Sequence, residues 1–218
     1  MKFTADKLLL YAVTDRSYAG RLSFYEQLEQ ALAGGVSMIQ LREKELELDA
    51  LIEEAREIQR LCHRYSVPLI INDNVQAAVK SGADGVHVGQ SDETVASIRQ
   101  RLGDDFIIGA TAKTVKQAQR AEAEGASYLG VGAVFPSPTK PNAVRITQDE
   151  LSEIIASVSI PCVAIGGITL DNINCLSGCG ISGVAVISSL FAAADIKLAA
   201  QSLRKSSEAI VCQKNYKP

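Results

Sequence analysis

The stretch AGGVSMIQ, residues 33–40, closes one structural element and opens another. Its glycine pair is typical of a helix end, and the apolar run that follows has the composition of a buried strand. The same joint recurs as SGADGVHVG at residues 81–89, EGASYLGVG at 124–132 and GCGISGVAV at 178–186. A helix end followed at once by a strand, repeated along the chain, predicts alternating helices and parallel strands.

Eight short apolar runs are the strand candidates, at residues 8–14, 36–42, 68–72, 84–89, 106–111, 127–134, 161–167 and 183–188. Most of the segments between them carry apolar residues at helical spacing. Eight such units without a long linker predict an α/β protein with one domain, a single (β/α)8 TIM barrel over residues 1–218. An open doubly wound sheet is the alternative, but VTDRSYAG, residues 13–20, lacks the glycine-rich nucleotide fingerprint.

The composition limits the class of protein and its partners. The chain has 218 residues, 47% of them hydrophobic and 22% charged, which is enough for one sizeable core. A net charge of −3 gives no overall field to attract nucleic acid or a membrane surface, so we expect neither partner. Without a membrane-length apolar run or a signal-peptide pattern, a cytoplasmic location is expected. The five cysteines lack paired C-x-x-C spacing, and we interpret them as free thiols.

Polar side chains follow almost every predicted strand, at the end where the chemistry of a (β/α)8 barrel lies. Because side chains alternate along a strand, even-numbered residues of the second strand should line the barrel and odd-numbered ones should face the helices. The inward set is Val36, Met38, Gln40 and Arg42, and the outward set includes Ile39 and Leu41. Gln40, Arg42 and Lys44 then rise in that order toward the open end of the barrel, its mouth. The alternative is a solvated loop over residues 42–45.

The rim residues predict an anion site. Arg42 offers a planar donor fork for phosphate oxygens, and Lys44 and Lys140 are compact positive charges. Asp73 and Asp92 would repel the anion, by about 4 kcal/mol for unit charges roughly 4 Å apart at an effective dielectric near 20. Mg²⁺ resolves the conflict, since it takes one or two carboxylates plus phosphate oxygens. Helix capping by these aspartates is an equal alternative.

A second anion site is indicated on the other side of the barrel. AIGGIT, residues 164–169, and ISSLF, residues 187–191, offer close-approaching backbone and a helix N-terminus. Plain turn glycines are the alternative there. The usual catalytic motifs are missing, and of the two histidines we interpret His63 as a surface or packing residue and His87 as a hydrogen-bonded barrel residue. Catalysis should then rest on positioning and electrostatics.

With these motifs in hand, the sequence resembles the thiamine-phosphate synthase family. The resemblance rests on YAVTD, QLREK, IIND, GVHVGQSD, GAT, PSPTK, AIGGIT and VISSL, in this order along the chain. It implies a transferase of thiamine biosynthesis that joins a hydroxymethylpyrimidine diphosphate to a thiazole phosphate, with Mg²⁺ required and pyrophosphate released. The partners are then two small-molecule substrates, and a homo-oligomer stays open.

The resemblance also implies roles for individual residues. Arg42, Lys44 and Lys140 would be catalytic, by stabilising the departing diphosphate. The pyrimidine diphosphate would lie on Gln40, Leu41, Arg42, Glu43, Lys44, Asn72, Thr111 and Lys140. The thiazole phosphate would lie on Ser137, Pro138, Thr139, Gly167, Ile187 and Ser188. Asp73 and Asp92 would ligate magnesium.

The mechanism expected from the resemblance is dissociative: the diphosphate leaves first, and the thiazole nitrogen then attacks the methylene cation. Two positions depart from the family pattern. Thr111 stands where many members have serine, which keeps the hydroxyl group, and Lys113 stands where many have histidine. Related thiazole tautomerases use a histidine in that neighbourhood, so its replacement favours the synthase. A tautomerase-like isomerase and a non-catalytic thiamine-phosphate sensor are the alternatives.

Overall fold

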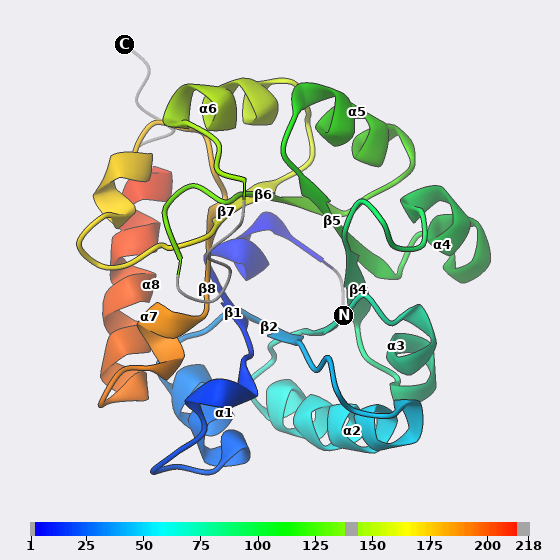
Figure 1. Cartoon of the computed structure of the whole chain (residues 1–218), viewed down its shortest axis with the longest axis vertical. Coiled ribbons are helices and arrows are strands. Elements are labelled where there is room, and N and C mark those ends of the chain that lie inside the picture. The colour runs from blue at the N-terminus through cyan, green and yellow to red at the C-terminus, as the bar shows by residue number, and fades with distance from the viewer. Residues whose placement is uncertain (1–2, 138–143, 213–218) are drawn as a thin grey trace.

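The structure is a computed structural model that describes residues 3–137 and 144–212. Eight parallel strands close into a barrel in chain order, and helices surround it (Figure 1). The strands are β1 Leu10–Val13, β2 Met38–Leu41, β3 Leu69–Asn72, β4 Gly85–Val88, β5 Ile107–Ala112, β6 Tyr128–Gly132, β7 Cys162–Ile165 and β8 Gly183–Val186. Pairing of Tyr11 with Ala185 in β8 and with Met38 in β2 closes the ring. The predicted (β/α)8 barrel is confirmed.

The helices begin and end where the sequence provides caps. They are α1 Phe24–Ala33, α2 Leu48–Arg64, α3 Val75–Ser81, α4 Val95–Leu102, α5 Val115–Ala123, α6 Gln148–Ala156, α7 Ser188–Phe191 and α8 Ile196–Cys212. Ser23 and Thr147 each form a capping box at the start of α1 and α6. Three 3₁₀ helices, η1 Ala5–Leu8, η2 Arg16–Tyr18 and η3 Ile173–Leu176, complete the described chain, and η3 stands between β7 and β8 in place of an α-helix.

The core has two layers separated by the strands. The outer layer packs strand residues such as Ile39 and Leu41 against the helices. The inner layer, which we call the barrel plug, fills the amino-terminal half of the barrel with Leu8, Tyr11, Met38, Ile70, Ile107, Tyr128, Val163 and Ala185. Met38 and Ile39 thus face opposite layers, as alternation predicts. Val36 does not follow the prediction: it precedes β2 and packs in the outer layer instead of lining the barrel.

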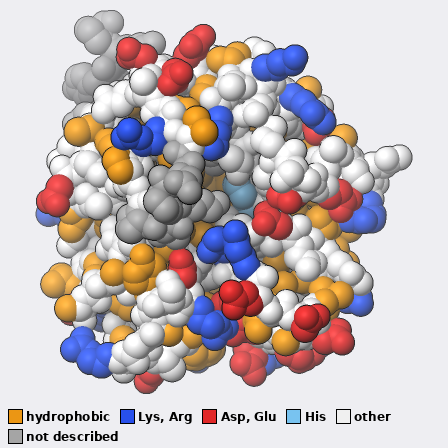
Figure 2. Space-filling view, viewed as in Figure 1, with side chains coloured by type: hydrophobic (Ala, Val, Ile, Leu, Met, Phe, Trp, Pro, Cys, Tyr) orange, Lys and Arg blue, Asp and Glu red, His pale blue; other side chains and the backbone are white. Residues whose placement is uncertain are grey.

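The carboxyl ends of the strands meet on the face shown in Figure 1, where the loops after β1 and β2 and the short helix α7 lie. The space-filling view of this face has basic and acidic side chains beside one another around its centre (Figure 2). Within residues 3–137 and 144–212, no helix has the length and apolar character needed to cross a membrane.

Candidate active site

A cavity of about 160 Å³, which we call the mouth pocket, lies above the barrel plug. All eight strands or the residues directly after them contribute to its wall. The lining residues are Tyr11, Val13, Gln40, Arg42, Asn72, His87, Thr111, Lys113, Gly130, Gly132, Ala133, Ser137, Val163, Ile165, Gly166, Ala185 and Ile187. The cavity thus combines a mostly apolar lining with a few polar and charged side chains, an arrangement that holds a small ligand and fixes its orientation.

Arg42 stands at the rim of the mouth pocket, directly after β2. Its backbone amide donates to the Thr14 hydroxyl at 2.9 Å, which ties the end of β2 to the end of β1. Its guanidinium lies 4.0 Å from Asp15 Oδ2, a loose ion pair, and its side chain is only 15% exposed. A mostly buried guanidinium with most of its donors still available binds phosphate oxygens well.

The other predicted cations are placed differently from Arg42. Lys44 is exposed, farther along the β2–α2 loop, as the predicted ascending order requires. Lys140 lies outside the described residues, as do Pro138 and Thr139. Lys113, to which the sequence assigned no role, lines the mouth pocket, and its ammonium donates to the Val144 carbonyl at 3.3 Å. Its position directly after β5 could have indicated that it belongs to the site, but the neighbouring motifs did not show whether its side chain points into the barrel.

Two residues of the predicted pyrimidine segment direct their side chains away from the mouth pocket. Leu41 is fully buried in the outer layer. The Glu43 carboxylate accepts from Arg16 at 3.2 Å, and Arg16 also donates to Glu54. Burial raises the pKa of Glu43, while Arg16 acts in the opposite direction. Any contact of Leu41 or Glu43 with a ligand in the pocket would therefore have to come from the backbone.

Asp73 and Asp92 follow β3 and β4, two neighbouring strands of the barrel. Asp73 has a positive φ of 60° and accepts from the Asn72 side chain at 2.5 Å. Asp92 accepts from the Gly89 amide at 2.7 Å, within the β4–α4 loop. Neither residue caps α3 or α4, because Asn74 and Thr94 do so. The capping alternative for the two aspartates is therefore wrong.

The donors present suit a magnesium ion. Two carboxylates from adjacent loops, completed by oxygen atoms of a phosphate ligand, form the hard oxygen set that Mg²⁺ prefers. Among the described residues, no group of three or more His, Cys, Asp or Glu side chains gathers as a metal site. Any magnesium held here would thus depend on its phosphate ligand as well as on the protein.

The opposite side of the mouth is formed by the loops after β6, β7 and β8. Gly167 has a φ of 65°, and a β-carbon there would lie 2.1 Å from the Pro136 carbonyl oxygen. Glycine is therefore required for the β7 loop to approach the loop that carries Ser137. Ile187 precedes α7, and Ser188 is its first residue. Of the predicted thiazole phosphate residues in the described chain, Ser137 and Ile187 line the mouth pocket, and Gly167 and Ser188 lie beside lining residues.

Inside the barrel, hydrogen bonds connect two predicted pyrimidine residues, Gln40 and Thr111. Gln40 donates to the Tyr11 hydroxyl at 2.7 Å, and Tyr11 lies 2.8 Å from the Tyr128 hydroxyl. His87 contacts Tyr128 through Nδ1 at 3.1 Å and Thr111 through Nε2 at 3.0 Å. His87 is the hydrogen-bonded barrel residue that the sequence suggested. No local pattern along the chain connects it with Tyr11 or Tyr128.

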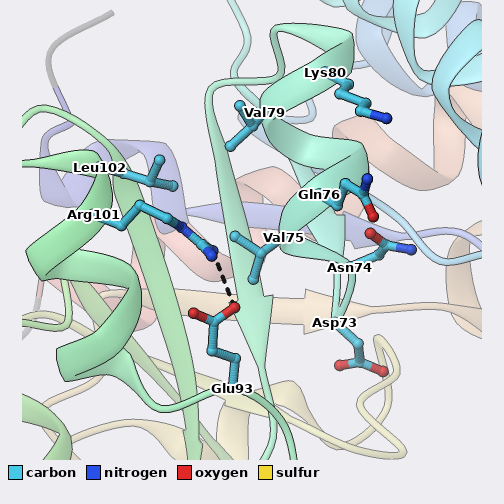
Figure 3. A pocket seen from close by; sticks show the side chains of 9 residues that line it. All are labelled: Asp73, Asn74, Val75, Gln76, Val79, Lys80, Glu93, Arg101 and Leu102. Carbon is cyan, nitrogen blue, oxygen red and sulfur yellow. Dashed lines mark hydrogen bonds and ion pairs between the residues drawn. The ribbon is translucent and has the colours of Figure 1, made fainter.

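A larger hollow of about 840 Å³ lies outside the barrel, between α3 and α4 (Figure 3). Its wall includes Val79 on α3 and an ion pair of 3.1 Å between Glu93 and Arg101. Asp73 lies at one end, pointing away from the α3 side chains. Of the predicted site residues in the described chain, Asp73 alone lines this hollow, whereas six others line the mouth pocket, so its larger size does not make it the active site.

Comparison with known proteins shows which family the chain belongs to. Residues 10–190 match the family described as thiamine monophosphate synthase. The chain is 44% identical over 202 residues to a thiamine-phosphate synthase of Methanobrevibacter smithii, covering 93% of this chain and 96% of that one. It is 42% identical over 200 residues to thiamine-phosphate synthase 2 of Streptococcus pneumoniae, covering 92% and 95%.

Two solved structures share the fold of this chain. A thiamine phosphate pyrophosphorylase from Pyrococcus furiosus superposes with a TM-score of 0.87 and 35% identity, covering 95% of this chain and 98% of that chain. A 3-hexulose-6-phosphate synthase superposes with a TM-score of 0.64 at 17% identity, covering 91% and 99%, which shows a shared fold only.

Proposed function

The chain belongs to the thiamine monophosphate synthase family, and from this premise we propose how its mouth pocket carries out the reaction. The substrates are 4-amino-2-methyl-5-(diphosphooxymethyl)pyrimidine and hydroxyethylthiazole phosphate. The bond between the methylene carbon and the diphosphate oxygen breaks, and a bond from the thiazole nitrogen to that carbon forms. The products are thiamine phosphate and pyrophosphate. We place this biosynthetic enzyme in the cytoplasm.

The pyrimidine ring lies in the mouth pocket between Gln40 and Thr111, above the apolar plug. Its diphosphate reaches the rim, where Arg42 follows β2, Asn72 ends the neighbouring strand β3 and Lys44 stands farther out. The thiazole phosphate lies on the opposite side, at the loops of Ser137 and Gly167 and the start of α7. This arrangement brings the two reacting atoms together above the barrel axis, which supplies the orientation that a two-substrate reaction needs.

The protein's main chemical task is to stabilise charge on the departing diphosphate. Arg42 and Lys113 place positive charge in the mouth pocket, and the Arg42 side chain is mostly buried, so that its electrostatic interactions are stronger than in bulk solvent. Negative charge on the bridging oxygen grows as the bond breaks, so these cations bind the transition state more tightly than the substrate. Asp73 and Asp92 would hold Mg²⁺, which when bound neutralises diphosphate charge.

The observation that carries the proposal is the composition of the mouth pocket. Its described wall has a guanidinium, an ammonium and hydrogen-bonding side chains, but no carboxylate and only one imidazole, which is already bonded to Tyr128 and Thr111. Such a wall suits the departure of an anionic leaving group better than proton abstraction by a general base.

The test is product formation from both synthetic substrates. We expect thiamine phosphate and pyrophosphate in equal amounts, and neither when either substrate is omitted. Isomerisation of thiazole phosphate without the diphosphate would indicate a tautomerase instead. Binding of thiamine phosphate without turnover, by a folded protein supplied with Mg²⁺, would indicate a sensor.

A further inference from the structure

Five side chains inside the barrel form one continuous hydrogen-bonded chain, which we call the interior relay: Gln40, Tyr11, Tyr128, His87 and Thr111. They come from five different strands. The two ends, Gln40 and Thr111, line the mouth pocket, as do Tyr11 and His87, and both tyrosines are buried in the barrel plug. The relay thus joins two residues of the mouth through the interior of the protein.

Two strand glycines make room for the relay. A β-carbon at Gly109 would lie 2.3 Å from the Tyr128 hydroxyl and 2.5 Å from His87 Nδ1. At Gly130 it would lie 3.1 Å from the His87 ring. Gly109 and Gly130 belong to the paired strands β5 and β6, so a side chain at Gly109 would push the tyrosine and the imidazole apart. The contact between them depends on this local shape.

All hydrogen bonds of the relay must be donated in the same direction along it, because each hydroxyl group and the neutral imidazole have a single proton to donate. Burial raises the pKa of both Tyr11 and Tyr128, so their hydroxyls keep these protons. When Gln40 donates to Tyr11, the acceptor for the buried Tyr11 proton among the described side chains is Tyr128, so Tyr11 donates to Tyr128 and Tyr128 to His87 Nδ1. His87 then carries its proton on Nε2 and donates it to Thr111. The Thr111 hydroxyl proton is left for the mouth pocket.

The charge of the mouth favours this sense over the reverse. The reverse sense would turn the Gln40 amide so that its NH₂ group faced the pocket. Arg42 and Lys113 line the same pocket, and a carbonyl oxygen near two cations is more stable than an NH₂ group there. Gln40 therefore presents an acceptor to the mouth, and Thr111 presents a donor.

We propose that Tyr11, Tyr128 and His87 are positioning residues that fix Gln40 as an acceptor and Thr111 as a donor toward the pyrimidine ring. The inference rests on the proposed function, because it assigns a role within that site. A 4-aminopyrimidine complements the fixed pair, since its amino group donates and its ring nitrogens accept. A 4-oxo analogue presents an acceptor in place of the amino donor, and the buried Gln40 oxygen would be left without a partner.

The sense of the relay can be tested without any ligand. The chain contains only two histidines, so a spectrum of protein labelled with ¹⁵N-histidine has few signals, and His63→Gln assigns them. We expect neutral His87 with its proton on Nε2. A proton on Nδ1, or on both nitrogens, at neutral pH would overturn the assignment.

Its effect on ligand choice is tested by equilibrium binding of the 4-amino and 4-oxo pyrimidine monophosphates, whose leaving group is too poor to react. We expect the wild type to bind the amino form roughly tenfold more tightly, or more, because the oxo form leaves a buried acceptor unpaired. Tyr128→Phe cuts the relay in the middle and lets Gln40 turn, so the ratio should fall toward one. Tyr25→Phe removes a hydroxyl that accepts from Arg64 on the outer surface, and should keep the wild-type ratio.

The outcomes separate the inference from the proposed function. An unchanged ratio in folded Tyr128→Phe would make the relay a purely structural network. Tyr11→Phe, which removes the partner of Gln40 itself, gives the same test if Tyr128→Phe does not fold. A wild type that forms no thiamine phosphate contradicts the proposed function, whereas the histidine spectrum still tests the relay.

Discussion

Met38 and Arg42 belong to the same segment and face the same barrel interior, yet one packs in the core and the other lines a cavity. Met38 is fully buried among the apolar side chains of the barrel plug, and Arg42, four residues later, lines the mouth pocket. Other strands show the same change, as from Ile70 in the plug to Asn72 in the mouth. Within two inward-facing positions, the segment thus passes from the packed plug to the wall of the mouth pocket.

From this difference we expect mutations in the mouth to lower activity and mutations in the plug to lower stability. Arg42→Ala should lower kcat/KM by roughly 10² to 10³, the usual effect of removing one donor to transition-state charge. Its melting temperature should stay close to the wild type, because the guanidinium makes only a loose ion pair with Asp15. Steady-state kinetics and calorimetry measure the two effects.

The matched control for Arg42→Ala is Arg60→Ala, which truncates an exposed arginine on α2. It should leave both the kinetics and the melting temperature unchanged. Loss of folding in Arg42→Ala would show that the rim arginine is structural, and the division between an active mouth and a stabilising plug would then be wrong.

The reverse result is expected in the plug. Ile70→Ala should lower the free energy of unfolding by roughly 2–5 kcal/mol, because it opens a cavity among fully buried side chains. KM for either substrate should change little in the protein that remains folded. Urea denaturation measures the loss, with Leu198→Ala, at a position 58% exposed, as the control. A stable Ile70→Ala variant with impaired kinetics would contradict the division.

The strand positions were predictable because alternation and apolar composition are local properties of the sequence, and the polar strand ends followed from them. Val36 was misplaced because the pattern does not show where the strand begins. Glu43 and Arg16 are 27 residues apart, and nothing local predicts that this pair turns the carboxylate away from the mouth. The contact between Tyr11 and Tyr128 spans 117 residues and requires Gly109, so only the closed barrel reveals it.

A smaller effect is expected at the two carboxylates in the loops after β3 and β4. Asp92→Asn should raise the Mg²⁺ concentration for half-maximal activity by about tenfold or more, as loss of a metal-site carboxylate weakens binding. Asparagine keeps the oxygen that accepts from the Gly89 amide, so the loop should hold its shape. Activity measured against Mg²⁺ concentration tests this, with exposed Asp105→Asn as the control. An unchanged Mg²⁺ requirement would exclude Asp92 as a ligand.

The loops on the thiazole side give a finer test. Gly167→Ala should raise KM for thiazole phosphate severalfold, because strain of roughly 1–3 kcal/mol must be relieved by moving the Ser137 loop. Gly178 has a similarly positive φ of 80°, but a β-carbon there meets nothing within 4 Å. Gly178→Ala therefore controls for backbone strain without a clash. Equal kinetic effects in both variants would show that the close approach at Gly167 has no role in binding.

The smallest effect concerns the border between plug and mouth. Burial raises the pKa of Tyr11, so above pH 10 the folded protein holds a proton that the unfolded chain releases. Folded stability should therefore fall as the pH rises from 10, by about 1 kcal/mol or less at pH 10.5 for one tyrosine. Tyr11→Phe should lose less stability than the wild type over this range, and exposed Tyr65→Phe should lose as much. Urea unfolding at pH 8 and pH 10.5 measures the difference, and identical losses in all three proteins would contradict the assignment.

The most direct test of the mouth as the diphosphate site is a calorimetric titration of pyrophosphate into the wild-type protein, once with Mg²⁺ and once with excess chelator. We predict binding with Mg²⁺ and an affinity at least about tenfold lower without it, since Asp73 and Asp92 then repel the anion. Equal affinity under both conditions, or no binding under either by the folded protein, would contradict the assignment of the barrel mouth to a magnesium-bound diphosphate.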